Sequence, residues 1–381
     1  MEPLFRNENL KFGFGLMRLP QVDPNDWESP VDVEACKEMV DYFIDNGFTY
    51  FDTAWMYCGF QSEKATKEFL VNRHPRESFT LATKLHGGFF NDKEGMEKIL
   101  KTQLDNCGVD FFDYYLLHDI GEDHYEKYTR LGCFDWIVEK KKAGVFKHIG
   151  FSYHDTADLL DKVLTEHPEM EFVQLQINYL DWDSEGIQSR KCYEVCVKHN
   201  KPVIVMEPVK GGTLANVPDE VEKLFKDYNP NMSVPSWAIR FAATQPNVKI
   251  VLSGMGNMDM VRDNVSYMKE FKPLSDEELS IVKKATDIIN SSIAIPCTGC
   301  AYCVDGCPKK IAIPKYFSLY NTEKLEMEGK GFTPQAGYYN RLTTNYGKAS
   351  ECIGCGKCEK VCPQHLHIRE NLKLVAKQFE N

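Results

Sequence analysis

The sequence predicts an α/β fold in two parts: a (β/α)8 barrel over residues 1–290 and a smaller, cysteine-rich domain over residues 291–381. Three observations support this division. Short apolar runs alternate with amphipathic helical stretches up to about residue 290. Polar side chains recur where those runs end, as they do at the carboxyl face of a barrel. Eight of the 14 cysteines lie in the last 85 residues.

Seven apolar runs have the composition of buried strands, and one further, weaker strand completes the expected eight. Near-continuous apolar strands separated by helices indicate a parallel sheet that is covered on both faces. We expect strands over residues 50–53, 79–84, 114–118, 148–152, 173–178, 203–206 and 248–253. Amphipathic helices are expected between them, for example over residues 33–46, 62–73, 95–107 and 184–199.

A doubly wound sheet is the structural alternative to the barrel. Two features disfavour it. The segment FDTAWMY follows the first of these strands, where a dinucleotide-binding sheet would have a glycine fingerprint. Polar or ionisable residues also end most of the strands, namely Asp52, Lys84, His118, Ser152, Gln176 and Asn178. In a barrel these ends meet at one mouth.

Composition limits the function. The formal net charge is −11, which disfavours nonspecific binding to nucleic acid or to an anionic membrane. The sequence has no stretch of about twenty apolar residues that would span a membrane. Its first residues also lack the basic and apolar regions of a secretory signal. We therefore expect a cytoplasmic protein that acts on small molecules and contacts other proteins.

Four polar residues predict carbonyl chemistry at the barrel mouth: Asp52, Tyr57, Lys84 and His118. A lysine beside a tyrosine favours the phenolate, so we expect the pKa of Tyr57 to fall towards neutrality. Such a phenol can give a proton to a carbonyl oxygen or take it back. A carboxylate would hold the lysine, and a histidine could stabilise charge on the same oxygen. Each residue alone is also explained by an ordinary structural role.

An ordered set of segments resembles the aldo-keto reductase superfamily. The segments are GFGLMRLP (13–20), FDTAWMY (51–57), LATKLH (81–86), YYLLHDI (114–120), IGFSYHD (149–155), VQLQINYLD (173–181), VMEPVKGG (205–212) and SGMGNMDMVRDN (253–264). They cover most of residues 10–270. The resemblance implies a barrel that binds a nicotinamide cofactor, with Tyr57 as general acid and base and Asp52, Lys84 and His118 completing a tetrad.

The resemblance also implies a set of cofactor-binding residues. Ser152 and Gln176 would hold the nicotinamide carboxamide, and Met206 stands where the family has an aromatic ring that stacks on the nicotinamide. The glycines Gly211, Gly212 and Gly254 together with Asn264 would line the pyrophosphate and adenine end.

The sequence departs from the family pattern at two points that concern the cofactor. Tyr153 follows Ser152, where the family commonly has asparagine. Arg262 is the only cation in the segment where NADP-preferring members carry lysine and arginine, so both NAD(H) and NADP(H) stay open. A flavin, instead of or beside the nicotinamide, is a further alternative.

The C-terminal region contains the run C-x2-C-x2-C-x3-C-P twice. This run is the [4Fe–4S] ligand pattern of bacterial-type ferredoxins, in which the fourth cysteine ligates the other cluster. We therefore expect one cluster on Cys297, Cys300, Cys303 and Cys362 and a second on Cys352, Cys355, Cys358 and Cys307. Zinc is disfavoured, because its sites consist of two separated C-x2-C pairs. The 44 residues between the runs are more typical of an α-helical ferredoxin domain.

Three functions follow from this combination. The favoured one is an NAD(P)(H)-dependent carbonyl or alcohol oxidoreductase whose clusters exchange electrons with a ferredoxin, a flavodoxin or another redox protein. The second is an electron-transfer protein whose barrel holds a flavin or serves in docking. The third is a plain reductase with structural or sensing clusters. Exposed-cluster chemistry favours an anaerobic setting, and lysines beside the cysteines form either a solvated face or a docking surface.

Overall fold

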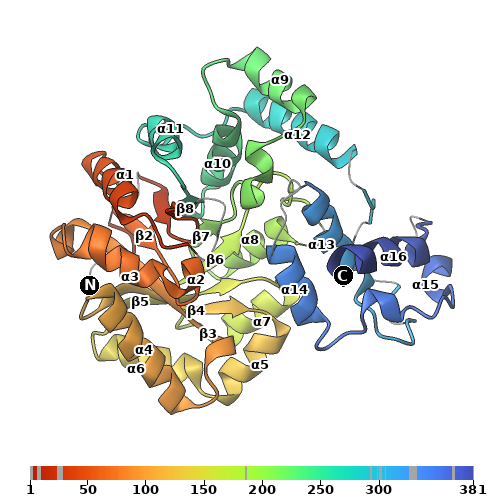
Figure 1. The fold of residues 1–381 in the computed structure, drawn as a ribbon, viewed down its shortest axis with the longest axis horizontal. Helices are drawn as coiled ribbons and strands as arrows, with labels where there is room; N and C mark the ends of the chain where they lie inside the picture. Colours follow the sequence, from red (N-terminus) through yellow and green to blue (C-terminus); the bar gives the residue numbers. More distant parts are fainter. Residues whose placement is uncertain are drawn as a thin grey trace.

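The computed structural model confirms the predicted barrel (Figure 1). Its described residues are 3–6, 10–23, 29–184, 187–291, 294–297, 299, 303–304, 306–325, 333–362 and 365–380. Eight parallel strands close in sequence order. They are β1 (Phe12–Gly15), β2 (Tyr50–Asp52), β3 (Thr80–His86), β4 (Phe112–Ile120), β5 (Phe146–Tyr153), β6 (Phe172–Gln176), β7 (Val203–Met206) and β8 (Val248–Gly254).

The weak eighth strand of the prediction is β1, which pairs with both β2 and β8 and so closes the barrel. Its sequence FGFG is half glycine, and glycine weakens the strand signal. Gly13 has a packing reason to be glycine. A Cβ at this position would come within 2.8 Å of the Leu252 side chain and 2.9 Å of that of Ile250.

The helices follow the strands and bury their apolar faces against them. Around the barrel they are α1 (Val33–Asp45), α2 (Tyr57–Phe60), α3 (Ser62–Thr66), α4 (Lys93–Cys107), α5 (Glu122–Arg130), α6 (Cys133–Lys142), α7 (Ala157–Glu166), α8 (Ser189–Lys198), α9 (Asp219–Tyr228), α10 (Val234–Thr244), α11 (Met258–Met268) and α12 (Asp276–Ser291). The expected helix over 62–73 is divided, because a π-helical turn, Lys67–Val71, follows α3.

The C-terminal region is mainly helical, as predicted, with α13 (Ile313–Leu325), α14 (Pro334–Leu342), α15 (Lys357–Lys360) and α16 (Ile368–Phe379). It has its own core, centred on Tyr316, Phe317, Tyr339 and Val375. In Figure 1 these helices (blue) lie to one side of the barrel, with α13 and α14 nearer to it than α15. In the described residues no helix combines the length and hydropathy needed to cross a membrane.

A parallel bridge between Ile311 and Gly347 joins the segments that adjoin the two cysteine groups. The contact is close: a Cβ on Gly347 would lie 2.2 Å from the carbonyl oxygen of Lys309. Any residue other than glycine would therefore separate the two halves of this region. The division at residues 290 and 291 stays a prediction, and α12 ends at that point.

Candidate active site

The four residues predicted to act together meet at the carboxyl end of the barrel. Asp52 ends β2, Tyr57 begins α2, and Lys84 and His118 lie near the ends of β3 and β4. The Lys84 ammonium lies 2.5 Å from the Asp52 carboxylate and 3.4 Å from the Tyr57 hydroxyl, and it donates to both. The rings of Tyr57 and His118 meet edge to face, with their centroids 6.0 Å apart.

The ion pair beneath Tyr57 is fully enclosed, with Lys84 0 % and Asp52 2 % exposed. Lys84 also donates to the Thr53 carbonyl at 2.8 Å, and Gln174 donates to the second oxygen of Asp52 at 3.1 Å. Burial lowers the pKa of Lys84, and the charge of Asp52 opposes this shift. The pair is thus hydrogen-bonded on both sides, as a buried pair must be to persist.

The expected fall in the pKa of Tyr57 is wrong for this structure. Burial raises the pKa of Tyr57 well above its ordinary value, and the carboxylates of Asp52, Glu207 and Asp119 raise it further. Burial, which the sequence does not reveal, is the main cause, and Asp52 at 2.5 Å also neutralises the charge of Lys84. Tyr57 is therefore a neutral phenol, a form suited to giving a proton.

His118 is also neutral, because burial and the charge of Lys84 lower its pKa well below the ordinary value. Its Nδ1 is buried and has no hydrogen-bond partner among the residues that the structure describes. Buried polar atoms are rarely unpaired, so this nitrogen, on a ring that meets that of Tyr57, is available to a partner that the protein itself does not supply.

A buried polar network behind Lys84 was not predicted. Glu63 of α3 is 2 % exposed and accepts hydrogen bonds from Thr83 at 2.8 Å and Gln103 at 2.9 Å. Gln103 also donates to the Lys84 carbonyl at 3.0 Å, so the network holds the backbone that carries the lysine. Glu63 lies in the helical sequence SEKAT, which looks like an ordinary exposed face.

The residues predicted for the nicotinamide lie on neighbouring strands. The Ser152 hydroxyl accepts from the Asp119 N–H at 2.7 Å, which leaves its own proton free to be donated. The side-chain nitrogen of Gln176 donates to Asp181 at 2.8 Å. Gln176 and Met206 are paired residues of β6 and β7, so they lie at the same height in the barrel.

The residues predicted for the phosphate end are distributed over two loops. Gly211 and Gly212, after β7, have φ values of 64° and 113°, a conformation that favours glycine. Gly254 ends β8, and a Cβ there would lie 3.2 Å from the side chain of Arg18. Arg18 is an exposed cation that was not among the predicted cofactor-binding residues. Asn264 is engaged within the fold, by Ser253 at 3.1 Å and Tyr267 at 2.5 Å.

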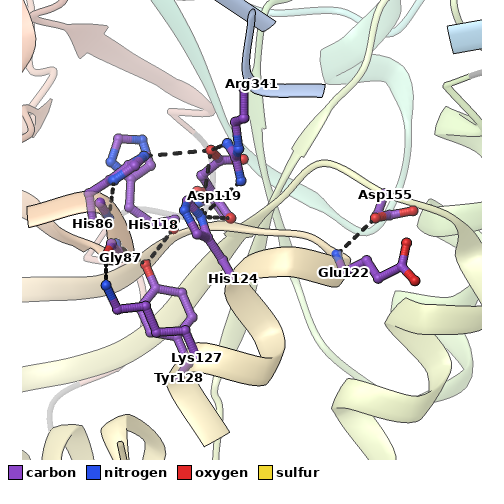
Figure 2. Close-up of polar contacts among 12 residues, drawn as sticks. His86, Gly87, His118, Asp119, Glu122, His124, Lys127, Tyr128, Asp155 and Arg341 are labelled. Atoms are coloured by element: carbon purple, nitrogen blue, oxygen red, sulfur yellow. Dashed lines mark hydrogen bonds and ion pairs between the residues drawn. The ribbon is translucent and has the colours of Figure 1, made fainter. Parts of the chain in front are cut away.

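The end of β4 is irregular directly after His118. Its register with β5 shifts between Leu117 and Ile120, and Asp119 has a φ of 60°. Bulges of this kind redirect side chains next to active sites. Here the Asp119 carboxylate turns into a group with His86 of β3 and His124 of α5 (Figure 2).

The same group receives a residue from the C-terminal region. Figure 2 shows Arg341 of α14 reaching the Asp119 carboxylate, to which it donates. A second guanidinium nitrogen lies 3.1 Å from Nδ1 of His124. Asp119 and Arg341 are 222 positions apart, and no local pattern in the sequence indicates this contact.

The cysteines suit cluster ligation. Cys300 lies outside the described residues, which include the other seven cysteines of the two groups. Cys303 and Cys358 are buried in the C-terminal core, whereas Cys355 is exposed. The Ile311 N–H donates to the sulfur of Cys307 at 3.5 Å. The assignment of individual cysteines to each cluster stays a prediction.

Comparisons with known proteins agree with this architecture. The sequence pattern of the aldo/keto reductase family matches residues 11–287. The chain belongs to the aldo/keto reductase family. This aldo/keto reductase is an oxidoreductase with an additional domain, because the pattern of the 4Fe-4S dicluster domain matches residues 296–367. The fusion predicted from the sequence is thereby confirmed.

Relatives of the aldo/keto reductase match its barrel. An uncharacterised oxidoreductase of Schizosaccharomyces pombe is 25% identical over 265 residues, which are 67% of this chain and 80% of the relative. One from Bacillus subtilis is 21% identical, over 65% of this chain and 86% of its own. A Klebsiella pneumoniae aldo-keto reductase solved with NADPH has a TM-score of 0.57 at 20% identity, over 72% of this chain and 90% of its own.

Proposed function

We propose that the protein reduces a carbonyl compound with NADPH or NADH, with Tyr57 as the proton donor. The observation that carries this proposal is the pair of buried contacts that Lys84 makes, one with Asp52 and one with Tyr57. The ring of His118 faces the same phenol. A neutral phenol, an ammonium and a neutral imidazole around one point are the groups that a carbonyl oxygen needs as it gains charge.

The residues divide the proton chemistry among them. Tyr57 donates its proton to the carbonyl oxygen of the substrate, and Lys84 stabilises the phenolate that this donation leaves. His118 donates a hydrogen bond to the same oxygen, in the tautomer with a ring N–H facing it. Asp52 orients Lys84 and keeps it charged within the barrel. In the reverse direction the phenolate takes the proton of an alcohol.

The nicotinamide would lie against β5, β6 and β7. The free hydroxyl proton of Ser152 suits the carboxamide oxygen, and the side-chain oxygen of Gln176 suits its nitrogen, since the Gln176 nitrogen is used by Asp181. When bound, the reduced nicotinamide supplies hydride to the carbonyl carbon. The Klebsiella enzyme solved with NADPH and the cation of Arg18 beside Gly254 support NADPH over NADH.

The clusters would exchange single electrons with a redox protein. Cys355 is exposed, and its neighbour Ile353 is 60% exposed, so the second group of cysteines borders the surface. Lys357 and Lys360 lie in the short helix α15 directly after it. The exposed Ile353 and these two lysines suit an acidic partner such as a ferredoxin or a flavodoxin. None of the matches reported above supports a flavin in the barrel.

Tyr57→Phe tests the reduction. The variant should bind NADPH as tightly as the wild type, retain its iron–sulfur absorbance and lose turnover of an aldehyde and ketone panel, because phenylalanine has no proton to donate. NADPH oxidation at 340 nm measures turnover, and quenching of nicotinamide fluorescence measures binding. Unchanged turnover would remove Tyr57 from the reaction.

An anaerobic titration tests the electron relay. NADPH is added to the oxidised protein while the visible iron–sulfur band and the EPR spectrum are followed. Bleaching of the band would place both parts of the protein on one electron path. Carbonyl reduction without bleaching would mean that the clusters do not receive electrons from NADPH.

A further inference from the structure

Helix α14 connects the C-terminal domain to the barrel mouth. Tyr339 of α14 is buried in the C-terminal core, where it stacks on Phe379 and contacts Tyr316. Tyr338 and Arg341 lie three positions apart on this helix, so they share a face. Arg341 contacts Asp119, the residue that directly follows His118 in β4. This face of α14 therefore borders the site that holds His118.

The group that receives Arg341 has the composition of a metal site, since one ligand atom each of His86, Asp119 and His124 lies within 4.8 Å of the others. The hydrogen bonds of His86 oppose metal binding. Nδ1 of His86 accepts from Gly88 at 2.9 Å, so the proton is on Nε2, which faces Asp119 at 3.6 Å. Nδ1 of His124 donates to the Asp119 carbonyl at 2.8 Å, so its Nε2 is unprotonated. A metal needs unprotonated nitrogens, and the nitrogen of His86 that faces Asp119 is protonated.

The group instead suits a carboxylate surrounded by donors, with the guanidinium as its cation. Asp119 is mostly buried, and burial alone would raise its pKa. His86, whose Nε2 lies 3.6 Å from the carboxylate, and the charge of Arg341 outweigh burial and lower the pKa of Asp119. Arg341 is the one permanent cation that contacts this carboxylate in the described part of the chain.

Asp119 is coupled to the proposed active site by the backbone. It directly follows His118, and its left-handed conformation forms the irregular end of β4. Its N–H donates to Ser152, one of the residues proposed to hold the nicotinamide. The position of the Asp119 carboxylate thus affects both the imidazole on one side and the serine hydroxyl on the other.

We propose that Arg341 is a positioning residue of the reductase site: the C-terminal domain, through α14, holds Asp119 and thereby sets His118 and Ser152 at the barrel mouth. This inference rests on the proposed carbonyl reduction. It means that the barrel is completed by the domain that carries the cysteines, and that the two domains do not work independently.

Arg341→Met tests the proposal, with Arg341→Lys for rescue and Arg73→Met as the matched control. Arg73 pairs with Asp41 at 2.5 Å and is exposed to a similar extent, but it precedes β3 and so lies at the opposite end of the barrel. In Arg341→Met we expect kcat to fall by roughly 10- to 100-fold, as for other small misplacements at active sites, with a smaller change in KM. Lysine keeps the charge and should restore part of the loss.

The pH profile separates positioning from general destabilisation. Without Arg341 the negative Asp119 is left among imidazoles, and the pKa of His124, which burial and the charge of Arg341 lower, should rise towards its ordinary value of about 6.5. The groups that face Asp119 are His86, His118, His124 and His154, with the phenols of Tyr57, Tyr128 and Tyr338. Arg341→Met should therefore show an acidic decline in kcat that the wild type, Arg341→Lys and Arg73→Met lack.

Hydrogen exchange gives a readout that does not need turnover. Arg341→Met should increase amide exchange in the β4 peptide Phe112–Ile120, and Arg73→Met should not. Equal exchange and equal kinetics in Arg341→Met and Arg73→Met would overturn the positioning role. If Tyr57→Phe retains full turnover, the proposed reduction fails instead, and exchange alone then decides whether Arg341 holds the end of β4.

Discussion

Lys84→Met would leave the Asp52 carboxylate buried without its cation. Methionine has nearly the length of lysine, so the substitution removes the charge and three donated hydrogen bonds and leaves little cavity. The affected acceptors are Asp52, the Thr53 carbonyl and Tyr57. Gln174 would still donate to one oxygen of Asp52. Removal of one partner from a buried ion pair typically destabilises a protein by about 3–5 kcal/mol.

Protonation of Asp52 limits the loss of unfolding free energy in Lys84→Met. A buried aspartate without a counter-ion takes up a proton, and at pH 7 this costs about 4 kcal/mol relative to an ordinary pKa of about 3.9. In the variant the folded state then binds one more proton than the unfolded state, so its stability decreases as the pH rises. We therefore expect a loss of about 3–4 kcal/mol at pH 7 that shrinks by roughly 1.4 kcal/mol per pH unit towards pH 5.

Anaerobic guanidinium unfolding followed by tryptophan fluorescence measures this loss, because all five tryptophans precede residue 290 and report on the barrel. Lys84→Met/Asp52→Asn is the matched control, since asparagine keeps the acceptor for Gln174 and removes the charge. The double variant should be more stable than Lys84→Met at pH 7 and should lose the pH dependence. A loss below about 1 kcal/mol, or one that does not change with pH, would refute the reasoning.

Three further predictions follow from the site and the fold. Because burial raises the pKa of Tyr57, kcat/KM for carbonyl reduction should stay level through neutral pH and fall only above about pH 10; a decline centred near pH 7 would contradict this. Because burial lowers the pKa of His118, the folded state binds fewer protons than the unfolded state below about pH 6.5. Acidification through that range should therefore lower the unfolding free energy by up to about 1.4 kcal/mol per pH unit. His118→Gln should reduce this slope. Gly347→Ala should abolish the iron–sulfur absorbance, because its Cβ would overlap the Lys309 carbonyl. The tryptophan unfolding curve of the barrel should stay the same. Normal cluster content in this variant would show that the bridge between Ile311 and Gly347 is dispensable.

The barrel strands were largely predictable because most are continuous apolar runs that end in polar residues. The strand β4 is a clear example: its apolar part and His118 were placed, but its irregular end was not. A bulge depends on the register with β5, which single-sequence periodicity does not contain. The strand β1 was indistinct for a different reason, since Gly13 is selected by the side chains that pack over it.

The tetrad was predictable as a set, whereas its electrostatics were not. Ordered motifs placed Asp52, Tyr57, Lys84 and His118, and the structure brings them together. The direction of the Tyr57 pKa depends on burial and on how the charge of Lys84 is shared, and both are properties of the folded site.

Contacts between distant segments were also beyond the sequence. The contact of Arg341 with Asp119 joins two domains, and neither residue has a motif that indicates the other.

The placement of α14 bears on why a reductase would carry iron–sulfur clusters. A nicotinamide transfers two electrons together, whereas each cluster transfers one, so an electron path between them needs an intermediate carrier. A mechanical link between the two domains needs no such carrier. If cluster ligation keeps the C-terminal core folded around Tyr339, α14 stays in place and Arg341 holds Asp119. Loss of the clusters would then weaken carbonyl reduction even when no electron passes between the domains, so oxidative cluster damage would decrease turnover of the barrel.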